Sequence, residues 1–183
     1  MLIGITGAKG SGKDTLADAF IQKNFRSTKF AGALKDMLRT LYRCAGVNEV
    51  TIERKLEGDL KEEPCDVLCG KTPRWAMQSL GTEWRNMIHT QLWSQIWESG
   101  VEALLLEGAP VVCSDVRFHH EAAAIRDMGG YLIRVDRPGC GEGDQHASEV
   151  EMGDIQVDVT FSNIGTISQL HTKAEEYLKE ITT

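Results

Sequence analysis

The sequence lacks two features that would decide its class at once: a long apolar run and an excess of positive charge. No run approaches the roughly 20 apolar residues that a membrane-spanning helix needs. Among 183 residues, 20 are Lys or Arg and 27 are Asp or Glu, which gives a formal net charge of −7. Broad nucleic-acid binding needs a basic face, although a few local arginines can still hold a small phosphorylated ligand. We therefore expect no membrane partner and no nucleic-acid partner.

Cysteine is also sparse, and its pattern excludes other classes of protein. Five cysteines, an odd number in a chain with intracellular character, indicate reduced thiols. Cys65 and Cys69 are spaced more widely than a C-x-x-C pair, and no Cys/His pair of matching spacing follows them, which disfavours a zinc site. The apolar N-terminal residues are used by a strand, so we expect no secretion signal.

The remaining composition is that of a globular protein, with 42% hydrophobic and 26% charged residues. The length suits one domain with a sizeable core. Strand patterns alternate with helix patterns, which predicts an α/β fold with a parallel sheet. The expected strands are residues 1–6, 27–30, 111–115, 131–136 and 157–161, and the clearest expected helices begin near residues 13, 31, 73, 118 and 166.

A glycine-rich stretch directly follows the first expected strand. Residues 7–13 read Gly-Ala-Lys-Gly-Ser-Gly-Lys, and a helical pattern begins at once after them. In the order strand, G-x-x-x-x-G-K and helix, the loop amides and the helix N-terminus converge on phosphate, and Lys13 reaches the β- and γ-phosphates. This context disfavours a merely flexible turn. The expected ATP-binding residues in this stretch are Ala8, Lys9, Gly10, Ser11, Gly12, Lys13, Asp14 and Thr15.

Asp14 stands where Ser or Thr normally follows the lysine. A carboxylate beside polyphosphate is repelled unless a cation lies between them, so we expect Asp14 and the Thr15 hydroxyl to face a magnesium ion. Asp115 lies at the carboxyl end of an apolar strand. P-loop proteins place their second magnesium contact at this position. The alternative for Asp115 is the N-cap of the helix that begins near Phe118.

The middle of the chain is harder to interpret. Residues 48–72 are polar and read as an irregular insertion. Thr72 and Pro73 indicate a helix start. Trp75 and Trp84 after it are expected to pack in an apolar core, whereas Arg74 and Arg85 offer the planar donors that phosphate binding needs. The loop from Arg137 onward has three glycines in five positions and could swing as a lid.

Seven segments together resemble a known family: Gly7 to Thr15, Lys29 to Lys35, Gln78 to Arg85, Ser114 to Phe118, Arg134 to Gly139, His146 to Glu149 and Asn163 to Thr166. They are similar to the phage-type deoxynucleoside monophosphate kinases, and the similarity runs nearly from end to end. The stretches around Gly81 to Arg85 and Asp115 to Phe118 are the more specific ones. A proline of the family pattern is replaced by Ala33.

The resemblance implies a three-layer P-loop fold that transfers the ATP γ-phosphoryl group to a deoxynucleoside monophosphate. It implies one kinase domain with a core of about 1–47 and 104–183, a helical acceptor-binding insertion of about 48–103 and a lid of about 137–149. ATP and Mg²⁺ would be the cofactors. A cytoplasmic location is expected, in the host cell if a phage encodes the chain. Whether the protein forms a homodimer stays open.

The resemblance also assigns site residues. The catalytic set is Lys13, Arg117 and Arg137; the acceptor-binding set is Phe30, Lys35, Arg74, Gln78, Trp84, Arg85 and Arg117; the metal set is Asp14, Thr15 and Asp115. Asn163 and Gly165 resemble a turn that contacts adenine, with an ordinary capped helix start as the alternative. Core packing is the alternative for Phe30 and Trp84. His146, Ser148 and Glu149 match the pattern without a derivable role.

Two other functions compete with this one. The turn at Asn163 also resembles dephospho-coenzyme A kinase, although the stretch from Gly81 to Arg85 favours a nucleotide acceptor. A non-kinase regulatory module that binds ATP is the second. The chain has no Asn-Lys-x-Asp guanine motif, and no glutamate directly follows Asp115 to position water, which disfavours such a switch.

Overall fold

A computed structural model describes residues 1–140 and 152–182 of the chain. Its centre is a five-stranded sheet in the order β2-β3-β1-β4-β5, and every neighbouring pair is parallel. The strands are β1 (Leu2–Thr6), β2 (Arg26–Thr28), β3 (Val111–Val116), β4 (Tyr131–Asp136) and β5 (Val159–Ser162). The α/β class with a parallel sheet is confirmed, and each expected strand lies within two residues of its predicted start.

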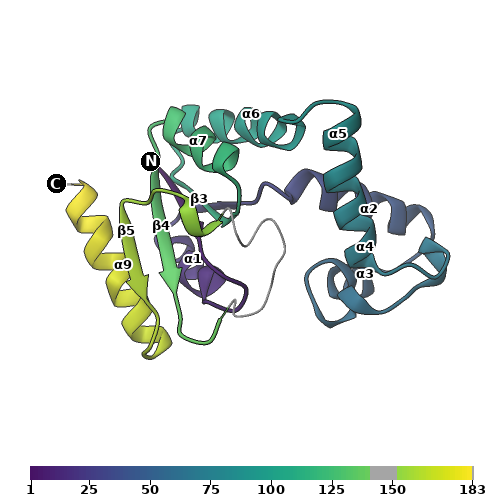
Figure 1. The fold of residues 1–183 in the computed structure, drawn as a ribbon, viewed down its shortest axis with the longest axis horizontal. Coiled ribbons are helices and arrows are strands. Elements are labelled where there is room, and N and C mark those ends of the chain that lie inside the picture. Colours follow the sequence, from purple (N-terminus) through teal and green to yellow (C-terminus); the bar gives the residue numbers. More distant parts are fainter. Residues whose placement is uncertain (141–151, 183) are drawn as a thin grey trace. The chain divides into compact units, whose positions relative to one another are not determined.

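Helices cover both faces of this sheet (Figure 1). On one face α1 (Lys13–Ile21) and α9 (Ile167–Thr182) pack through Phe20 and Leu170. On the other face the later part of α6 (Leu92–Leu106) and α7 (His119–Asp127) pack through Val101 and Ile125. Successive strand residues point to opposite faces, so β3 contributes Val112 to the first core and its two flanking residues to the second. The three-layer prediction is confirmed.

The chain forms two compact units. We call residues Met1–Phe30 and Trp97–Thr183 the sheet unit, and residues Ala31–Ile96 the helical unit. The boundary near the end of the helical unit lies inside α6. Within the described part of the chain, none of the helices combines the length and apolarity needed to cross a membrane.

The helical unit is built around its own small core. Its elements are α2 (Gly32–Cys44), α3 (Glu49–Leu56), the short turns η1 (Asp59–Glu62) and η2 (Asp66–Leu68), α4 (Pro73–Ser79), the π-helix η3 (Leu80–Trp84) and α5 (Arg85–Met87). Leu38 and Tyr42 of α2 pack on Ile52 and Leu56 of α3. Because of this packing α2 belongs to the helical unit, whereas the sequence had grouped residues up to 47 with the core.

The expectation of an irregular segment over residues 48–72 is wrong for α3. Asn48 caps this helix by accepting a hydrogen bond from the Thr51 amide at 2.9 Å, and Ile52 and Leu56 are fully buried. The predicted helix start at Thr72 is confirmed, since its hydroxyl accepts the Trp75 amide at 3.1 Å and Pro73 follows it.

Candidate active site

The glycine loop joins β1 to α1 and has the backbone shape of a phosphate-binding loop. Gly7 has a φ of 144° and Gly12 a φ of 104°, which side-chain-bearing residues rarely adopt. Space forbids a side chain too: a Cβ on Gly7 would lie 2.3 Å from the Val135 carbonyl oxygen, and one on Gly12 would lie 2.4 Å from Asn163 Nδ2. The loop is therefore pressed against the end of β4 and the turn after β5.

Lys13 lies across this loop. Its Nζ donates to the carbonyl oxygens of Gly7 at 2.5 Å and Ala8 at 2.8 Å. The Ser11 amide also donates to Ala8 O at 3.1 Å, while Lys9 and Gly10 form the exposed tip. An ammonium group has three donors, so Lys13 can exchange these carbonyls for phosphate oxygens.

Asn163 holds the loop from the other end of the chain. Its Nδ2 donates to Ser11 O at 2.8 Å, and its own amide donates to Asp136 O at 2.7 Å. The next residues start α9, where Thr166 and Gln169 hydrogen bond to one another. Thr166 thus caps α9 as the capped-helix alternative expects, and the adenine contact of Asn163 and Gly165 stays a prediction.

A hollow of about 350 Å³ lies beside this turn. Residues of α9 between Gln169 and Glu176 line it, and so do both predicted residues of the turn. The lining residues are Ser162, Asn163, Ile164, Gly165, Thr166, Gln169, Leu170, Thr172, Lys173 and Glu176.

Asp14 is exposed in the first turn of α1, and two groups from elsewhere in the sheet unit converge on it. Ser114 Oγ donates to Asp14 Oδ1 at 2.9 Å, and Lys29 Nζ lies 3.4 Å from the same oxygen. Partial desolvation would raise the pKa of Asp14, but the Lys29 ammonium and the Ser114 hydroxyl together outweigh it and leave the pKa lowered. Asp14 is therefore a carboxylate at neutral pH. Thr15 beside it is half-buried, and its carbonyl oxygen lies 3.1 Å from His171 Nε2.

Asp115 lies half-buried at the carboxyl end of β3. Its Oδ1 accepts the Phe30 amide at 2.9 Å and the buried Cys113 thiol at 3.3 Å. The N-cap of α7 is Phe118, not Asp115, so the capping alternative for Asp115 is wrong.

Glu121 instead accepts the hydrogen bonds of the backbone amides at the start of α7. Its Oε2 accepts the amides of Arg117 at 2.7 Å and Phe118 at 3.1 Å, and the side chain is buried. Burial, followed by the negative charge of Asp115, raises the pKa of Glu121 to about 8, although the two amide hydrogen bonds oppose the shift. Glu121 thereby fixes the backbone that carries Arg117.

The donor set at this edge fits a magnesium ion. Asp14 and Asp115 supply carboxylates and Ser114 a hydroxyl, and all are hard oxygen ligands. Over residues 1–140 and 152–182, no three His, Cys, Asp or Glu side chains gather as a metal site. Magnesium commonly takes only one or two protein carboxylates and completes its shell with phosphate oxygens and water. These residues thus suit an ion that arrives with a nucleotide.

The predicted catalytic arginines directly follow β3 and β4, the two strands that flank β1 in the sheet. Arg117 follows β3 and is half-buried, and Arg137 follows β4 and is exposed. Arg134, within β4, donates to the carbonyls of Met152 at 3.0 Å and Ile155 at 2.8 Å, so its described contacts anchor the chain before β5. Of the predicted lid, residues 141–149 with His146, Ser148 and Glu149 lie outside the described residues.

Phe30 does not present its ring at the surface. The side chain is 3% exposed, and its ring lies 4.1 Å from that of Trp97, centroid to centroid. The core-packing alternative therefore describes Phe30, and its link to the site is the backbone amide bound to Asp115.

In the helical unit, the predicted acceptor residues Arg74, Gln78, Trp84 and Arg85 all lie on the run α4–η3–α5. The middle of this run, residues Leu80–Trp84, is a π-helix, a rare widening that occurs frequently at functional sites. Trp93 Nε1 donates to Gly81 O at 3.0 Å, and its ring stacks with Trp84 at 6.2 Å and 17°. The sequence did not point to these contacts of Trp93, because an aromatic residue in a helical pattern is typical of ordinary core packing.

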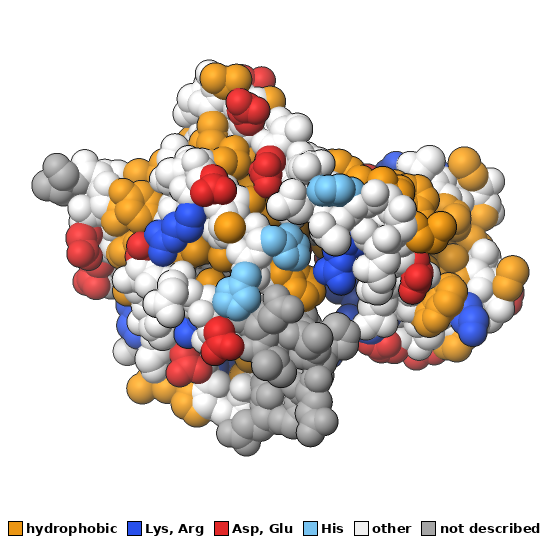
Figure 2. Space-filling view, turned by 45° about the horizontal axis from the view of Figure 1, so that its top comes forward, with side chains coloured by type: hydrophobic (Ala, Val, Ile, Leu, Met, Phe, Trp, Pro, Cys, Tyr) orange, Lys and Arg blue, Asp and Glu red, His pale blue; other side chains and the backbone are white. Residues whose placement is uncertain are grey.

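The expectation that both tryptophans pack in a core is wrong. Trp75 is 50% exposed and Trp84 39% exposed. Figure 2 shows apolar side chains on the surface of the helical unit, and Met87 and Ile88 just beyond Trp84 are exposed as well. A partly exposed aromatic side chain can contribute to stacking on a ligand.

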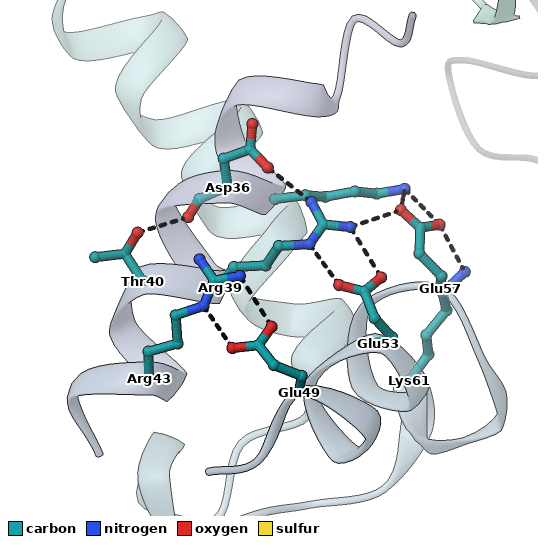
Figure 3. Close-up of polar contacts among 9 residues, drawn as sticks. Asp36, Arg39, Thr40, Arg43, Glu49, Glu53, Glu57 and Lys61 are labelled. Atoms are coloured by element: carbon teal, nitrogen blue, oxygen red, sulfur yellow. Dashed lines mark hydrogen bonds and ion pairs between the residues drawn. The ribbon is translucent and has the colours of Figure 1, made fainter. Parts of the chain in front are cut away.

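Lys35 and Arg74 are held by carboxylates within the helical unit. Lys35 Nζ donates to both oxygens of Glu57 at 2.7 and 2.9 Å, and Arg39 binds Glu53 beside it (Figure 3). Arg74 donates to Glu62. The two predicted acceptor cations are thus oriented by partners, although their ligand-binding roles stay predictions.

Comparison with known proteins decides the family. A sequence profile of the deoxynucleotide monophosphate kinase family matches residues 65–174. A protein of Acanthamoeba polyphaga mimivirus described as a deoxynucleotide monophosphate kinase is 34% identical, over 94% of this chain and 93% of the relative. The deoxynucleotide monophosphate kinase of Enterobacteria phage T4 is 26% identical, over 97% and 98% of the two chains. The chain belongs to the deoxynucleotide monophosphate kinase family.

The fold of this family member agrees with a solved P-loop kinase. Dephospho-CoA kinase from Campylobacter jejuni superposes with a TM-score of 0.54 over 98% of this chain and 96% of that chain, at 15% identity. At that identity the likeness shows the fold alone. Kinase membership implies a nucleoside triphosphate as phosphate donor, which agrees with the glycine loop. The profile match includes the π-helix and Asp115, so the family is recognised by segments outside that loop.

Proposed function

We propose that this chain transfers the γ-phosphoryl group of ATP to a deoxynucleoside 5′-monophosphate. The observation that carries the proposal is the convergence of the left-handed glycine loop, Lys13, Asp14 and Asp115 at one edge of the sheet, in a member of this kinase family. Ligands of open parallel α/β sheets bind at the carboxyl ends of the strands. We assign the reaction to the cytoplasm, where both nucleotides occur.

The reaction is a direct displacement. A phosphate oxygen of the monophosphate attacks the γ-phosphorus, the bond from that phosphorus to the β–γ bridging oxygen breaks, and its electron pair leaves on ADP. The products are a deoxynucleoside diphosphate and ADP. Such a transfer needs the reactants held in line and their charge neutralised, with little covalent help from the protein.

The donor side is assigned to the sheet unit. The loop amides and Lys13 would bind the ATP phosphates, and the hollow beside Asn163 and Gly165 would receive the adenine. Asp14, Thr15 and Asp115 would hold a magnesium ion, which supplies charge neutralisation to the triphosphate when bound. Arg137 would reach the transferring group from the loop after β4.

The acceptor side is assigned to the helical unit together with Arg117. Arg74, Arg85 and Lys35 are cations suited to a monophosphate, and the exposed Trp84 offers a face for a base, with Gln78 exposed on the same helical run. Glu121 fixes the backbone of Arg117 and so would orient its side chain. This division into a phosphate-donor core and a helical acceptor region is part of the proposal.

A panel of acceptors tests the function. ADP release is measured with ATP alone, with each deoxynucleoside monophosphate, with the matching ribonucleoside monophosphates and with dephospho-coenzyme A. We expect slow hydrolysis alone and an increase of at least about 10²-fold with one or more deoxynucleotides. Stimulation by dephospho-coenzyme A only, or fast hydrolysis that no acceptor changes, would contradict the proposal in favour of the two competing functions.

A further inference from the structure

Lys29 is a cation at the candidate site that neither the motif nor the family resemblance assigns. It directly follows β2, and its Nζ lies 3.4 Å from Asp14 Oδ1 in the first turn of α1. The Ser114 hydroxyl donates to the same oxygen at 2.9 Å from the end of β3. All three residues belong to the sheet unit. The parallel sheet thus brings Lys29 to the edge that carries the glycine loop.

Two lysines act on the Asp14 carboxylate at this point. Asp14 follows Lys13 directly, and its side chain is 77% exposed at the end of the loop that a triphosphate would occupy. A lone carboxylate there would repel phosphate. Lys13 and Lys29 both act on Asp14 electrostatically, and Asp14 lies in the first turn of α1, where the helix N-terminus adds partial positive charge.

The contact between Lys29 and Asp14 is one that a phosphate can replace. A tight charge-assisted N–H···O bond measures about 2.7–2.9 Å, whereas this contact is 3.4 Å. The Lys29 side chain is 31% exposed. Asp14 thus holds the Lys29 ammonium beside the loop at a distance longer than that of a tight hydrogen bond.

We propose that Lys29 is a second catalytic lysine, whose ammonium contacts the oxygens of the phosphoryl group during transfer. The inference rests on the proposed function, because it concerns the same displacement. Lys29 remains protonated throughout and donates hydrogen bonds to oxygens on which negative charge is spread in the transition state. No bond of Lys29 is made or broken, so the products are those given above.

Three variants test the inference. Lys29→Met removes the charge and keeps the chain length, and Lys29→Arg keeps a cation. The matched control is Lys23→Met, since Lys23 is also a sheet-unit lysine paired with a carboxylate: it lies just after α1, 2.8 Å from Glu175 of α9. For each protein kcat, both KM values and the melting temperature are measured, together with the affinities for ADP and for ADP with aluminium fluoride in magnesium buffer.

We expect Lys29→Met to lower kcat by about 10²–10³-fold, as removal of one transition-state donor commonly does. Its affinity for ADP should stay within threefold of wild type, while its affinity for ADP with aluminium fluoride, a mimic of the transferring group, should fall at least tenfold. Lys29→Arg should recover part of both losses, and Lys23→Met should match wild type.

Wild-type kcat and fluoride-complex affinity in Lys29→Met would overturn the inference. So would equal losses for ADP and its fluoride complex, or a melting temperature that falls enough to explain the loss in both Lys29 variants. If the wild-type protein turns over no monophosphate, the proposed function fails, and the fluoride measurement still decides the role of Lys29.

Discussion

The two units hold their polar groups in different ways. In the sheet unit the site side chains bond mostly to backbone: Lys13 to Gly7 O and Ala8 O, Asn163 to Ser11 O, and Glu121 and Asp115 to amides. In the helical unit the cations pair with side-chain carboxylates, as Lys35 does with Glu57. Other such pairs there are Arg39 with Glu53, Arg43 with Glu49, Arg54 with Asp59 and Arg74 with Glu62.

We expect the site side chains of the sheet unit to be held in fixed positions, and those of the helical unit to be able to change partners. A side chain bonded to a buried strand or loop can move only if the backbone moves, whereas an exposed ion pair exchanges partners at little cost. The sheet unit has a core on each face of its sheet, and the helical unit has one small cluster around Tyr42 and Ile52. The proposed phosphate-donor residues therefore lie on the sheet unit, and the proposed acceptor residues other than Arg117 lie on the helical unit.

The largest effect is expected from a substitution in the sheet unit. Lys13→Ala should lower kcat by at least about 10²–10³-fold, because the loop loses the ammonium that neutralises the donor phosphates. Folding should be unaffected, since the Gly7 and Ala8 carbonyls that it leaves can be hydrated. Turnover with the best acceptor and a circular-dichroism melt measure the two properties, and wild-type turnover would contradict the role of Lys13.

A smaller effect is expected at the π-helix of the helical unit. Trp93→Phe keeps the stacking on Trp84 but removes the indole donor from Gly81 O. Loss of one hydrogen bond of about 0.5–1.5 kcal/mol should raise the KM of the monophosphate about 2- to 10-fold and leave the ATP KM unchanged. Trp75→Phe, on α4 outside the π-turn, is the matched control. An equal rise in both KM values would contradict a role confined to the acceptor.

High salt should affect the helical unit more than the sheet unit. At 1 M NaCl the Debye length falls to about 3 Å, so the exposed ion pairs of the helical unit weaken. Amide exchange in α2 and α3 should therefore accelerate severalfold, while exchange in β1, β3 and β4 stays constant, because strand bonds do not depend on surface charge. Hydrogen exchange followed by mass spectrometry measures both units in one sample. Equal acceleration of amide exchange in both units would contradict the proposed difference between them.

The smallest predicted effect concerns Glu121, a titrating group within the sheet unit. Asp115, Cys113 and Arg117 are the charged or titratable groups that act on it. The folded-state pKa is raised to about 8 from an ordinary 4.5, so the folded protein keeps a proton that the unfolded chain releases. The stability that this proton contributes is complete below about pH 4.5 and is lost as the pH rises through 8.

Glu121→Gln should flatten this dependence between pH 5 and 8. Both amide bonds go to one carboxylate oxygen, which the glutamine carbonyl can replace. The melting temperature of the wild type should fall by a few degrees more than that of the variant over this interval. Identical slopes of melting temperature against pH would show that Glu121 does not titrate there.

Sequence reasoning succeeded where the signal is local. The glycine loop was recognisable because its glycines, its lysine and the flanking strand and helix are contiguous, and Thr72 with Pro73 marked a helix start for the same reason. It failed for α3, because only Ile52 and Leu56 are buried on that helix, Val50 is exposed, and charged residues surround them.

Most contacts between distant residues could not be predicted. Lys29 and Asp14 meet because β2 and β1 flank β3, and that strand order is not encoded near either residue. The burial of Glu121 and the exposure of Trp84 reverse what each residue type suggests alone. Residue type gives the chemistry, but only packing shows which groups are adjacent.

The sheet order also dictates when the nucleotide site can first exist during synthesis. β1 is made first, yet its two partners are β3, which begins at Val111, and β4. At about 5–20 residues per second, a ribosome needs roughly 5–20 s to deliver β3 after β1 has appeared. The glycine loop then waits for Asn163, 152 residues beyond Ser11. Affinity for ATP should therefore emerge late on the ribosome, and a nascent chain stalled before β5 should expose an unpaired apolar strand to chaperones.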